Sequence, residues 1–348
     1  MNRIKNISGL DVKAMQKSHE HWNSIAKPLN SLGILERYIM QIAGITGNPN
    51  VKLNKRCAVI MCADNGVVCE GVTQTGSDVT AIVANAVAEG TSNISRMAQT
   101  FNADVIAVDM GIKSDIKNDK VINRKIAYGT KNIARESAMT LQQAEQAISY
   151  GIDIVRDLKN KGTDIIVTGE MGIGNTTTSS AVTSVLLGVS PELVTGKGSG
   201  LDEVRFRHKI EVVKKATEIN SPDRNNPLEV LSKLGGFDIA GMTGLFLGGA
   251  VYHVPVIIDG VISAISALLA YRINPESRDF MLCSHVSKEP AGKMILDEIG
   301  LKPIINAELC LGEGTGGILL LPMLDGALSV YNSAHKFENL PMERYVEF

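Results

Sequence analysis

The 348-residue sequence has few aromatic residues and no excess of basic ones. Phe, Trp and Tyr make up 4% of the chain, and 35 Lys and Arg stand against 37 Asp and Glu, for a formal net charge of −2. Nucleic-acid-binding proteins carry clustered Lys and Arg and a high pI, so this composition indicates no nucleic-acid partner. With 44% hydrophobic and 21% charged residues, the chain is typical of a globular protein with one large or two unequal domains.

Paired cysteines and long apolar runs are also missing. None of the five cysteines forms a CxxC pair, which favours free thiols in a reducing cytoplasm over disulfides or a zinc site. The first 20 residues lack the apolar core of a signal peptide, so we expect a cytoplasmic protein without a metal. The longest apolar segment, 242–270, is interrupted by Gly248, Gly249, Pro255 and Asp259. A buried helix–strand–helix suits it better than a membrane span, which needs roughly 20 uninterrupted apolar residues.

Short apolar runs alternate with helical patterns along the chain. The runs at 57–62, 104–109, 164–168, 255–259 and 279–283 are typical of strands buried on both faces of a sheet. Segments of helical periodicity separate them. This alternation predicts an α/β fold with a Rossmann-like, mostly parallel sheet and helices on both faces. Residues 1–50 indicate two helices joined at 27–33 by Pro and Gly, and we expect the terminal helices to pack beside the sheet.

Acidic or glycine-rich turns follow several of the predicted strands. They lie at Asp64, Asp109, Glu170, Asp259 and His285. In a parallel sheet such turns fall on one edge, so we expect them to share one cleft. Asp64 also suits a plain turn, and His285 also suits a strand-end cap, so both interpretations stay open for these residues.

The segment 169–177, Gly-Glu-Met-Gly-Ile-Gly-Asn-Thr-Thr, joins a predicted strand to a predicted helix. A strand, a glycine-rich turn and a helix start form the arrangement that binds phosphate through free backbone N–H groups. The segment contains neither GxGxxG in register nor the Lys of a Walker A loop, which argues against a dinucleotide or NTP. We therefore predict a phosphate-binding turn and no cofactor.

Two further charged side chains, Glu313 and Lys209, are candidates for a catalytic or anion-binding role. Glu313 lies between glycines in 311–317, just before an apolar run. Glycine allows positive φ, and an acid held in such a loop can act as a general base; a tight turn with a solvated acid is the alternative. Lys209 borders the buried side of a helix capped by Asp202, where a snorkelling lysine is expected unless an anion lies near.

A helix after Ser77 shows an apolar stripe. Its members are Val79, Ile82, Val83, Ala86 and Val87, at the spacing of one helical face. We expect this face to be buried.

Three motifs, taken together, resemble a known family. They are KPLNSLGILE at 27–36, TGEMGIGNTTTSSA at 168–181 and LGEGTGG at 311–317, and CADNGVVCEGV at 62–72, GGFDIAGMTG at 235–244 and SHVSKEP at 284–290 agree with them. The chain resembles the nicotinate-nucleotide:dimethylbenzimidazole phosphoribosyltransferases of cobamide assembly from about residue 10 to about residue 335.

The resemblance implies a reaction and roles for particular residues. The 5-phosphoribosyl group of nicotinate mononucleotide passes to an aromatic base with inversion to an α-linkage, and nicotinate leaves. Glu313 matches the catalytic base of the family, and Ser287 matches a serine that the neighbouring subunit contributes to phosphate binding. The predicted substrate-binding residues are Glu170, Met171, Gly172, Gly174, Asn175, Thr176, Lys209, Ser287, Thr75, Val83 and Asp64.

The resemblance also implies an architecture. Family members are dimers with a large α/β domain and a small domain built from both chain ends. We therefore expect 55–320 to form the large domain with the active site, and 1–54 with 321–348 to form a small, mainly helical domain. A homodimer is expected, a heterodimer with a homologous chain is the alternative, and neither a membrane nor a nucleic acid is a partner.

The sequence departs from the family pattern near the base pocket. Asp64-Asn65-Gly66 stands where the family usually has Asp-His-Gly, so Asn65 replaces the His. Thr75 and Val83 stand where a well-known family pattern has Ser and Gln, and Met171 replaces a common Leu. The acceptor therefore stays open between dimethylbenzimidazole and a phenol or p-cresol. Two other functions also stay open: a nucleotide hydrolase in which Glu313 activates water, and a non-catalytic subunit of an active homologue.

Overall fold

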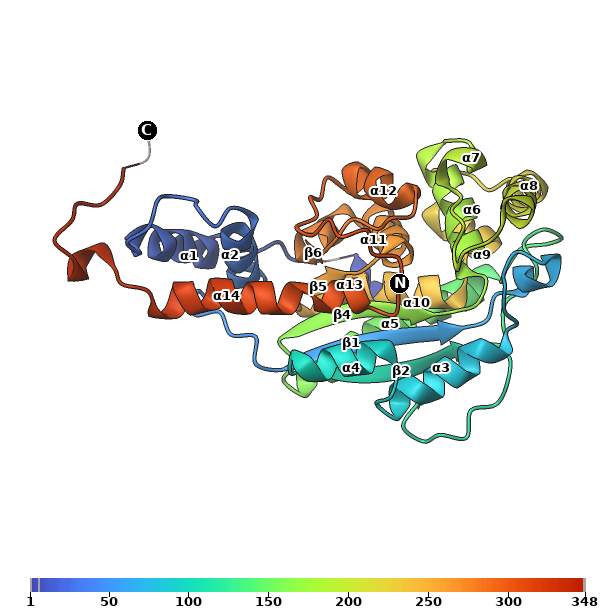
Figure 1. The fold of residues 1–348 in the computed structure, drawn as a ribbon, viewed down its shortest axis with the longest axis horizontal. Helices are drawn as coiled ribbons and strands as arrows, with labels where there is room; N and C mark the ends of the chain where they lie inside the picture. Colours follow the sequence, from blue (N-terminus) through green and yellow to red (C-terminus); the bar gives the residue numbers. More distant parts are fainter. Residues whose placement is uncertain (1, 6, 347–348) are drawn as a thin grey trace.

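The computed structural model describes residues 2–5 and 7–346, and these form one six-stranded parallel sheet with helices on both faces (Figure 1). The strands are β1 (Arg56–Ala63), β2 (Asp104–Gly111), β3 (Ile122–Asn123), β4 (Ile165–Met171), β5 (Val256–Ile258) and β6 (Met281–Cys283). Their order is β3-β2-β1-β4-β5-β6, and every pair is parallel. The predicted Rossmann-like fold is confirmed.

Two groups of helices cover the two faces. The first face carries α5 (Leu141–Asn160), α6 (Asn175–Leu187), α9 (Pro227–Leu234), α10 (Phe237–Tyr252), α11 (Val261–Ile273) and α12 (Ala291–Ile299). The second carries α2 (Ile34–Thr46), α3 (Asp78–Ala88), α4 (Asn93–Thr100), α13 (Thr315–Ile318) and α14 (Leu320–Ser333). The remaining helices are α1 (Val12–Ser24), α7 (Pro191–Val194) and α8 (Glu203–Asn220), with short 3₁₀ turns at Asn2–Ile4 (η1), Gly66–Glu70 (η2), Pro275–Phe280 (η3) and Phe337–Asn339 (η4).

The central strand β1 explains why its sequence is apolar without interruption. Val59 and Met61 point into the core on the α5 and α10 side, whereas Ile60 and Cys62 point into the core on the other side. Successive side chains of a strand alternate between faces, so a strand covered on both faces must be apolar throughout.

Helices α5 and α10 pack with their backbones in direct contact. A Cβ atom added at Gly151 would lie 2.8 Å from Gly244 Cα, a separation that no real side chain tolerates. These glycines therefore bring α10 close enough for Phe237 and Asp238, at its start, to reach the edge of the sheet.

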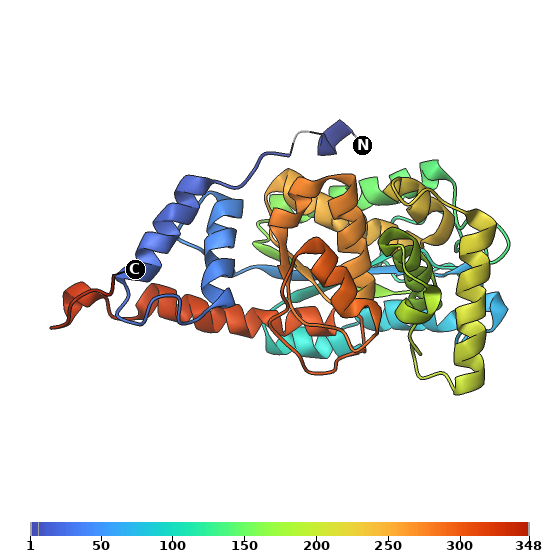
Figure 2. The same cartoon turned by 90° about the horizontal axis from the view of Figure 1, so that it is seen from above.

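Helices α1, α2 and one end of α14 lie together beside the sheet (Figures 1 and 2). The Trp22 and Tyr331 rings pack edge to face with centroids 4.8 Å apart. Ile39 and Ile42 of α2 belong to the same hydrophobic cluster as Ile60 of β1, so the core continues from the sheet into this helical group. The expected division into two domains stays a prediction.

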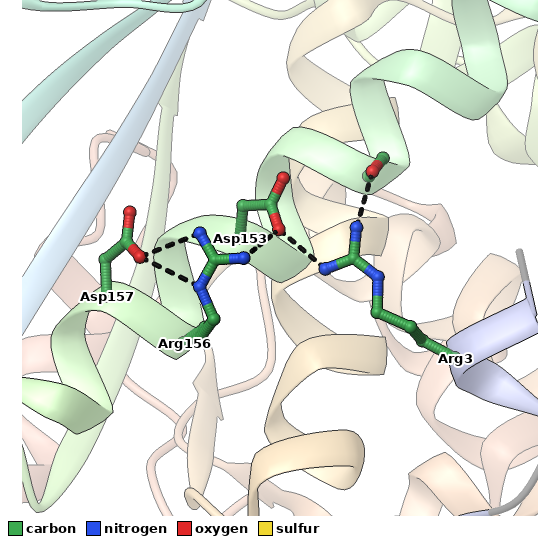
Figure 3. Close-up of polar contacts among 5 residues, drawn as sticks. Arg3, Asp153, Arg156 and Asp157 are labelled. Carbon is green, nitrogen blue, oxygen red and sulfur yellow. Dashed lines mark hydrogen bonds and ion pairs between the residues drawn. The ribbon is translucent and has the colours of Figure 1, made fainter.

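Polar contacts hold the amino-terminal region together and attach it to α5. Lys27 Nζ lies 2.8 Å from Glu36 Oε1, and the same oxygen accepts the backbone N–H of Leu32 at 2.8 Å. Farther along, Arg3 of η1 pairs with Asp153 of α5 at 2.6 Å, beside an Arg156–Asp153 pair (Figure 3). The arginine pairs are partly exposed and contribute on the order of 0–1 kcal/mol each, whereas in the Lys27–Glu36 pair the Glu36 side chain is buried and Lys27 is half-buried.

The predicted apolar face of α3 is confirmed only in part, because Val87 is buried and Val79, Val83 and Ala86 are half-buried, whereas Ile82 is exposed. The buried side chains of this helix are Thr80, Ala84 and Val87, and Ile82 is 61% exposed. Sequence periodicity placed the stripe one position off because the small residues Thr80 and Ala84, which fit closely against the sheet, score low for hydrophobicity. Among the described residues, no helix has the length and apolar character that crossing a membrane requires.

Candidate active site

A cleft of about 300 Å³ opens beyond the carboxyl ends of β4, β5 and β6. Glu170 and Met171 end β4, Asp259 follows β5 and His285 follows β6, and all four line the cleft. The chain order reverses between β1 and β4, and open α/β sheets bind ligands near this reversal.

Most of the predicted site residues meet in this cleft. Those that line it are Thr75, Val83, Glu170, Met171, Gly172, Gly174, Asn175, Thr176, Ser287 and Glu313. Lys209 lies behind the wall, bonded to Thr176. Asp64 instead lines a separate cavity together with Lys113 and Tyr128. Ser287 lies on the wall of the chain's own cleft, so its contribution to a partner's site stays a prediction.

The loop that carries Glu313 has an unusual backbone. Gly312, Glu313 and Gly314 all have positive φ, at 82°, 59° and 88°. A left-handed conformation at a residue other than glycine costs about 1–2 kcal/mol, so the surroundings must hold it. The Asp259 carboxylate does so by accepting the N–H of Gly314 at 3.1 Å and of Gly317 at 2.7 Å.

The Glu313 side chain is buried and forms no ion pair among the described residues. It is 9% exposed, and its Oε2 atom has no hydrogen-bond donor within reach in the described part of the chain. Burial raises the pKa of Glu313 above its ordinary value, and polar groups of Asn93 and Ile94 at the start of α4 oppose this change. A carboxylate with a raised pKa is better suited to accept a proton near neutral pH.

Glu170 belongs to the strand and not to the turn that the sequence predicted, because β4 continues to Met171. The Asn175 side-chain amide donates to Glu170 Oε2 and, at 3.2 Å, to Asp238 Oδ2. Burial, followed by the negative charge of Asp238, raises the pKa of Glu170 to about 8. Asp238 lies outside the predicted set, although the segment GGFDIAGMTG contains it.

The predicted phosphate turn leads directly into α6. Gly174 precedes the helix with φ 94°, and no side chain of the described residues caps the helix start. Gly172, Gly174 and Thr176 line the cleft. The first N–H groups of a helix lack partners within the helix and favour negative charge, so this wall suits a phosphate.

Lys209 is completely buried, and the predicted snorkelling lysine is wrong. Its Nζ atom donates to Thr176 Oγ1 at 2.8 Å and to the Gly196 carbonyl at 3.0 Å. Burial lowers the pKa of Lys209 to about 8, and the Glu289 carboxylate opposes this change. Helical spacing placed Lys209 at an edge because it carries no information about what packs against the helix, here Thr176 of α6 and the 196–200 loop.

Among the cleft-lining residues that were not predicted as site residues, Asp259, His285 and Glu289 carry carboxylate or imidazole side chains. Asp259 and His285 were expected to share a cleft as turns after strands, and they do, whereas Glu289 stood out only as part of SHVSKEP. Asp109, expected in the same cleft, lies within β2 and outside the lining. Burial lowers the pKa of His285. Its Nδ1 atom lies 3.1 Å from Ser284 Oγ.

The fold and the cleft define a doubly wound α/β protein with an acid-lined ligand site beside a helix start. A sequence model of the family described as phosphoribosyltransferase matches residues 7–340. The chain belongs to this family, which confirms the resemblance drawn from the motifs.

Named relatives and solved structures agree with this assignment. The nicotinate-nucleotide–dimethylbenzimidazole phosphoribosyltransferase of Clostridium acetobutylicum is 45% identical over 99% of this chain and 98% of its own length. That of Ruminiclostridium cellulolyticum is 46% identical over 98% and 97%. The crystal structure of CobT from Thermus thermophilus superposes with a TM-score of 0.89 at 31% identity, over 96% of this chain and 100% of that one.

Proposed function

We propose that this enzyme transfers the 5-phosphoribosyl group of nicotinate mononucleotide to an aromatic base, with dimethylbenzimidazole as the first acceptor. The names of the relatives supply both substrates. The observation that carries the proposal is the Glu313 carboxylate, which is buried, lies in a loop of three left-handed residues and lines the same cleft as the start of α6.

The chemistry needs one base and one phosphate site. A ring nitrogen of the acceptor forms a bond to C1′ of the ribose while the bond from C1′ to the nicotinate nitrogen breaks. Nicotinate leaves with that electron pair, and the proton of the acceptor ring passes to Glu313. Backbone N–H groups of 172–176 other than those of Ile173 and Asn175, which donate to Thr80 Oγ1 and the Gly172 carbonyl, hold the phosphate and align the two reactants, with Lys209 behind them.

Product analysis tests this reaction. With nicotinate mononucleotide and dimethylbenzimidazole, chromatography should detect nicotinate and an α-riboside phosphate in equal amounts. A chain that forms neither product at any pH would overturn the proposal and favour the non-catalytic subunit.

The phosphate site has its own test. Nicotinate riboside lacks the phosphate, so it should be a very poor donor. Equal use of the riboside and the mononucleotide would remove the phosphate role from 172–176 and Lys209.

The acceptor side of the cleft supports a second, broader substrate range. Val79, Val83 and Met171 give this wall apolar side chains, and Thr75 adds a methyl group. A polar group that pairs with an imidazole edge discriminates strongly against ligands that leave it unpaired, and Val83 has none. Methionine adapts to rings of varied shape. We therefore include phenol and p-cresol as acceptors, with Glu313 taking the hydroxyl proton to give an O-glycoside.

A competition assay separates the two acceptor ranges. The chain is given equimolar phenol, p-cresol and dimethylbenzimidazole with limiting donor. A phenolic riboside among the products supports the broader range. Benzimidazole product alone, at every phenol concentration, restricts the enzyme to benzimidazoles.

Ser287 connects the proposal to a dimer. If a partner subunit's serine completes the phosphate site, the active form is a homodimer or a heterodimer with a homologous chain. Sedimentation of the active enzyme tests this, because a fully active monomer would remove the partner contribution.

A further inference from the structure

One side-chain amide joins two buried carboxylates at the back of the cleft. Asn175 Nδ2, at the start of α6, donates to Glu170 Oε2 at the end of β4 and to Asp238 Oδ2 at the start of α10. Asp238 is fully buried, whereas Glu170 lines the cleft. Two carboxylates that share one site and lack a cation do not both ionise near neutral pH.

No neighbouring group in the described part of the chain supplies the missing positive charge. Asp259, after β5, adds a negative charge, and the Cys62 thiol of β1 has a pKa raised far above its ordinary value by burial. The backbone N–H of Ile239 donates to Asp238 Oδ1 at 3.0 Å, and polar groups of Glu313 and Asn65 nearby lower the pKa values of Glu170 and Asp238 respectively without offsetting the effect of burial. Among the described residues neither Glu170 nor Asp238 has an ion-pair partner, and the buried Lys209 faces Thr176 and Gly196 instead.

We propose that Asp238 is a positioning residue that keeps one proton on Glu170, so that Glu170 offers a neutral O–H donor to the substrate and not a negative charge. Nicotinate mononucleotide carries a phosphate and a carboxylate, both of which an ionised Glu170 would repel. The identity of this substrate rests on the proposed function, but the protonation of Glu170 does not.

The electrostatics of the pair give the direction of each effect. Burial raises the pKa of Asp238 to about 6, and burial together with the charge of Asp238 raises the pKa of Glu170 to about 8. Near pH 7 the single proton therefore resides on Glu170. The negative charge of Asp238 raises the pKa of Glu170, so without this charge Glu170 should ionise at lower pH.

Carbon-13 NMR of the substrate-free protein labelled at the glutamate side-chain carboxyls tests the protonation directly. The resonance that disappears in Glu170→Gln belongs to Glu170, and it should titrate near pH 8. In Asp238→Asn the same resonance should titrate roughly one to two pH units lower. The matched control is Asp109→Asn, which removes another buried carboxylate, within β2 and outside this cleft, and should leave the titration unchanged.

Kinetics test the consequence. For Asp238→Asn, kcat/KM for nicotinate mononucleotide at pH 7.5 should fall about three- to twentyfold, as the protonated fraction of Glu170 falls, and should recover on lowering the pH. A merely structural role would lower activity equally at every pH.

The outcomes separate this inference from the proposed function. A wild-type Glu170 resonance that titrates below pH 6, or one that Asp238→Asn does not move, overturns the inference even if transfer is active. The wild-type titration decides the matter if Asp238→Asn does not fold. A resonance near pH 8 in a chain without transferase activity would support the proton on Glu170 and overturn the proposed function.

Discussion

Two buried glutamates, Glu36 and Glu313, show how differently one residue type is used in this molecule. Glu36 is 2% exposed and is paired with Lys27 Nζ and the backbone N–H of Leu32. Glu313 is 9% exposed and has no cation partner among the described residues. Burial of an acid therefore does not by itself indicate function. What distinguishes Glu313 is that no cation in the described part of the chain neutralises it and that a cleft lies before it.

The backbone conformations of Glu36 and Glu313 also differ, since one residue is helical and the other is left-handed. Glu36 lies in the first turn of the regular helix α2, whereas Glu313 lies at φ 59° between two left-handed glycines. Strained residues persist where surrounding structure holds them, and they gather at active sites. The contacts of Asp259 to Gly314 and Gly317 are that support here.

The largest expected effect is on turnover. Glu313→Gln keeps the size of the side chain but cannot accept a proton, so kcat should fall by about 10²–10⁴-fold, while the melting temperature changes by only a few degrees. Steady-state kinetics and thermal unfolding of one preparation measure both. Nearly full turnover with every accepted base would show that Glu313 is not the base.

The next effect is on donor binding. Lys209→Met removes the charge and two hydrogen bonds behind Thr176, so KM for nicotinate mononucleotide should rise about 10–100-fold, as expected for loss of charged hydrogen bonds. Lys214→Met is the control, because Lys214 lies on the same helix but pairs with Glu192 and Glu211 at the surface. An equal rise in both variants would assign the effect to the helix and not to the cleft.

A smaller effect is expected from one methyl group in the Glu313 loop. A Cβ atom at Gly316 would overlap the His285 ring, so Gly316→Ala should lower the free energy of unfolding by about 1–3 kcal/mol and reduce activity. Gly326→Ala in α14 meets no atom of the described residues within 4 Å and should be neutral or stabilising by up to about 1 kcal/mol. Equal stability of the two variants in urea unfolding would contradict the tight packing of the loop.

The smallest effect on activity is expected from Glu36. Glu36→Gln leaves Lys27 without a counter-charge in a mostly buried site and should lower the free energy of unfolding by about 1–3 kcal/mol, with kcat unchanged. Chemical denaturation and steady-state rates measure the two quantities. A large loss of kcat in the folded variant would mean that the amino-terminal helices act on the cleft.

The comparison also explains what the sequence could predict. Continuous apolar runs predicted the strands because both faces of the sheet are covered, and glycine-rich segments predicted the cleft edge and the Glu313 loop. The motif KPLNSLGILE marks the family as clearly as LGEGTGG does, yet it forms the Lys27–Glu36 contact and lies outside the cleft lining. A motif alone therefore does not show whether its residues form a structural contact or line the active-site cleft.

Two features that escaped prediction, the complete burial of Lys209 and the place of Asp238 beside Asn175, depend on contacts between different elements. Lys209 is covered by Thr176 of α6 and by the 196–200 loop, and Asp238 of α10 is joined to Glu170 of β4 through Asn175 of α6. The face of α3 was misjudged because two small residues, Thr80 and Ala84, are buried there. Local periodicity carries no information about such contacts.

The most direct test of the account is the release of nicotinate from nicotinate mononucleotide by the wild-type chain, measured with and without dimethylbenzimidazole. A transferase whose buried Glu313 takes the proton of the acceptor should release nicotinate only when the base is present, with one α-riboside phosphate formed for each nicotinate. Release of nicotinate and ribose 5-phosphate at the same rate without the base would contradict the account and show that Glu313 activates water.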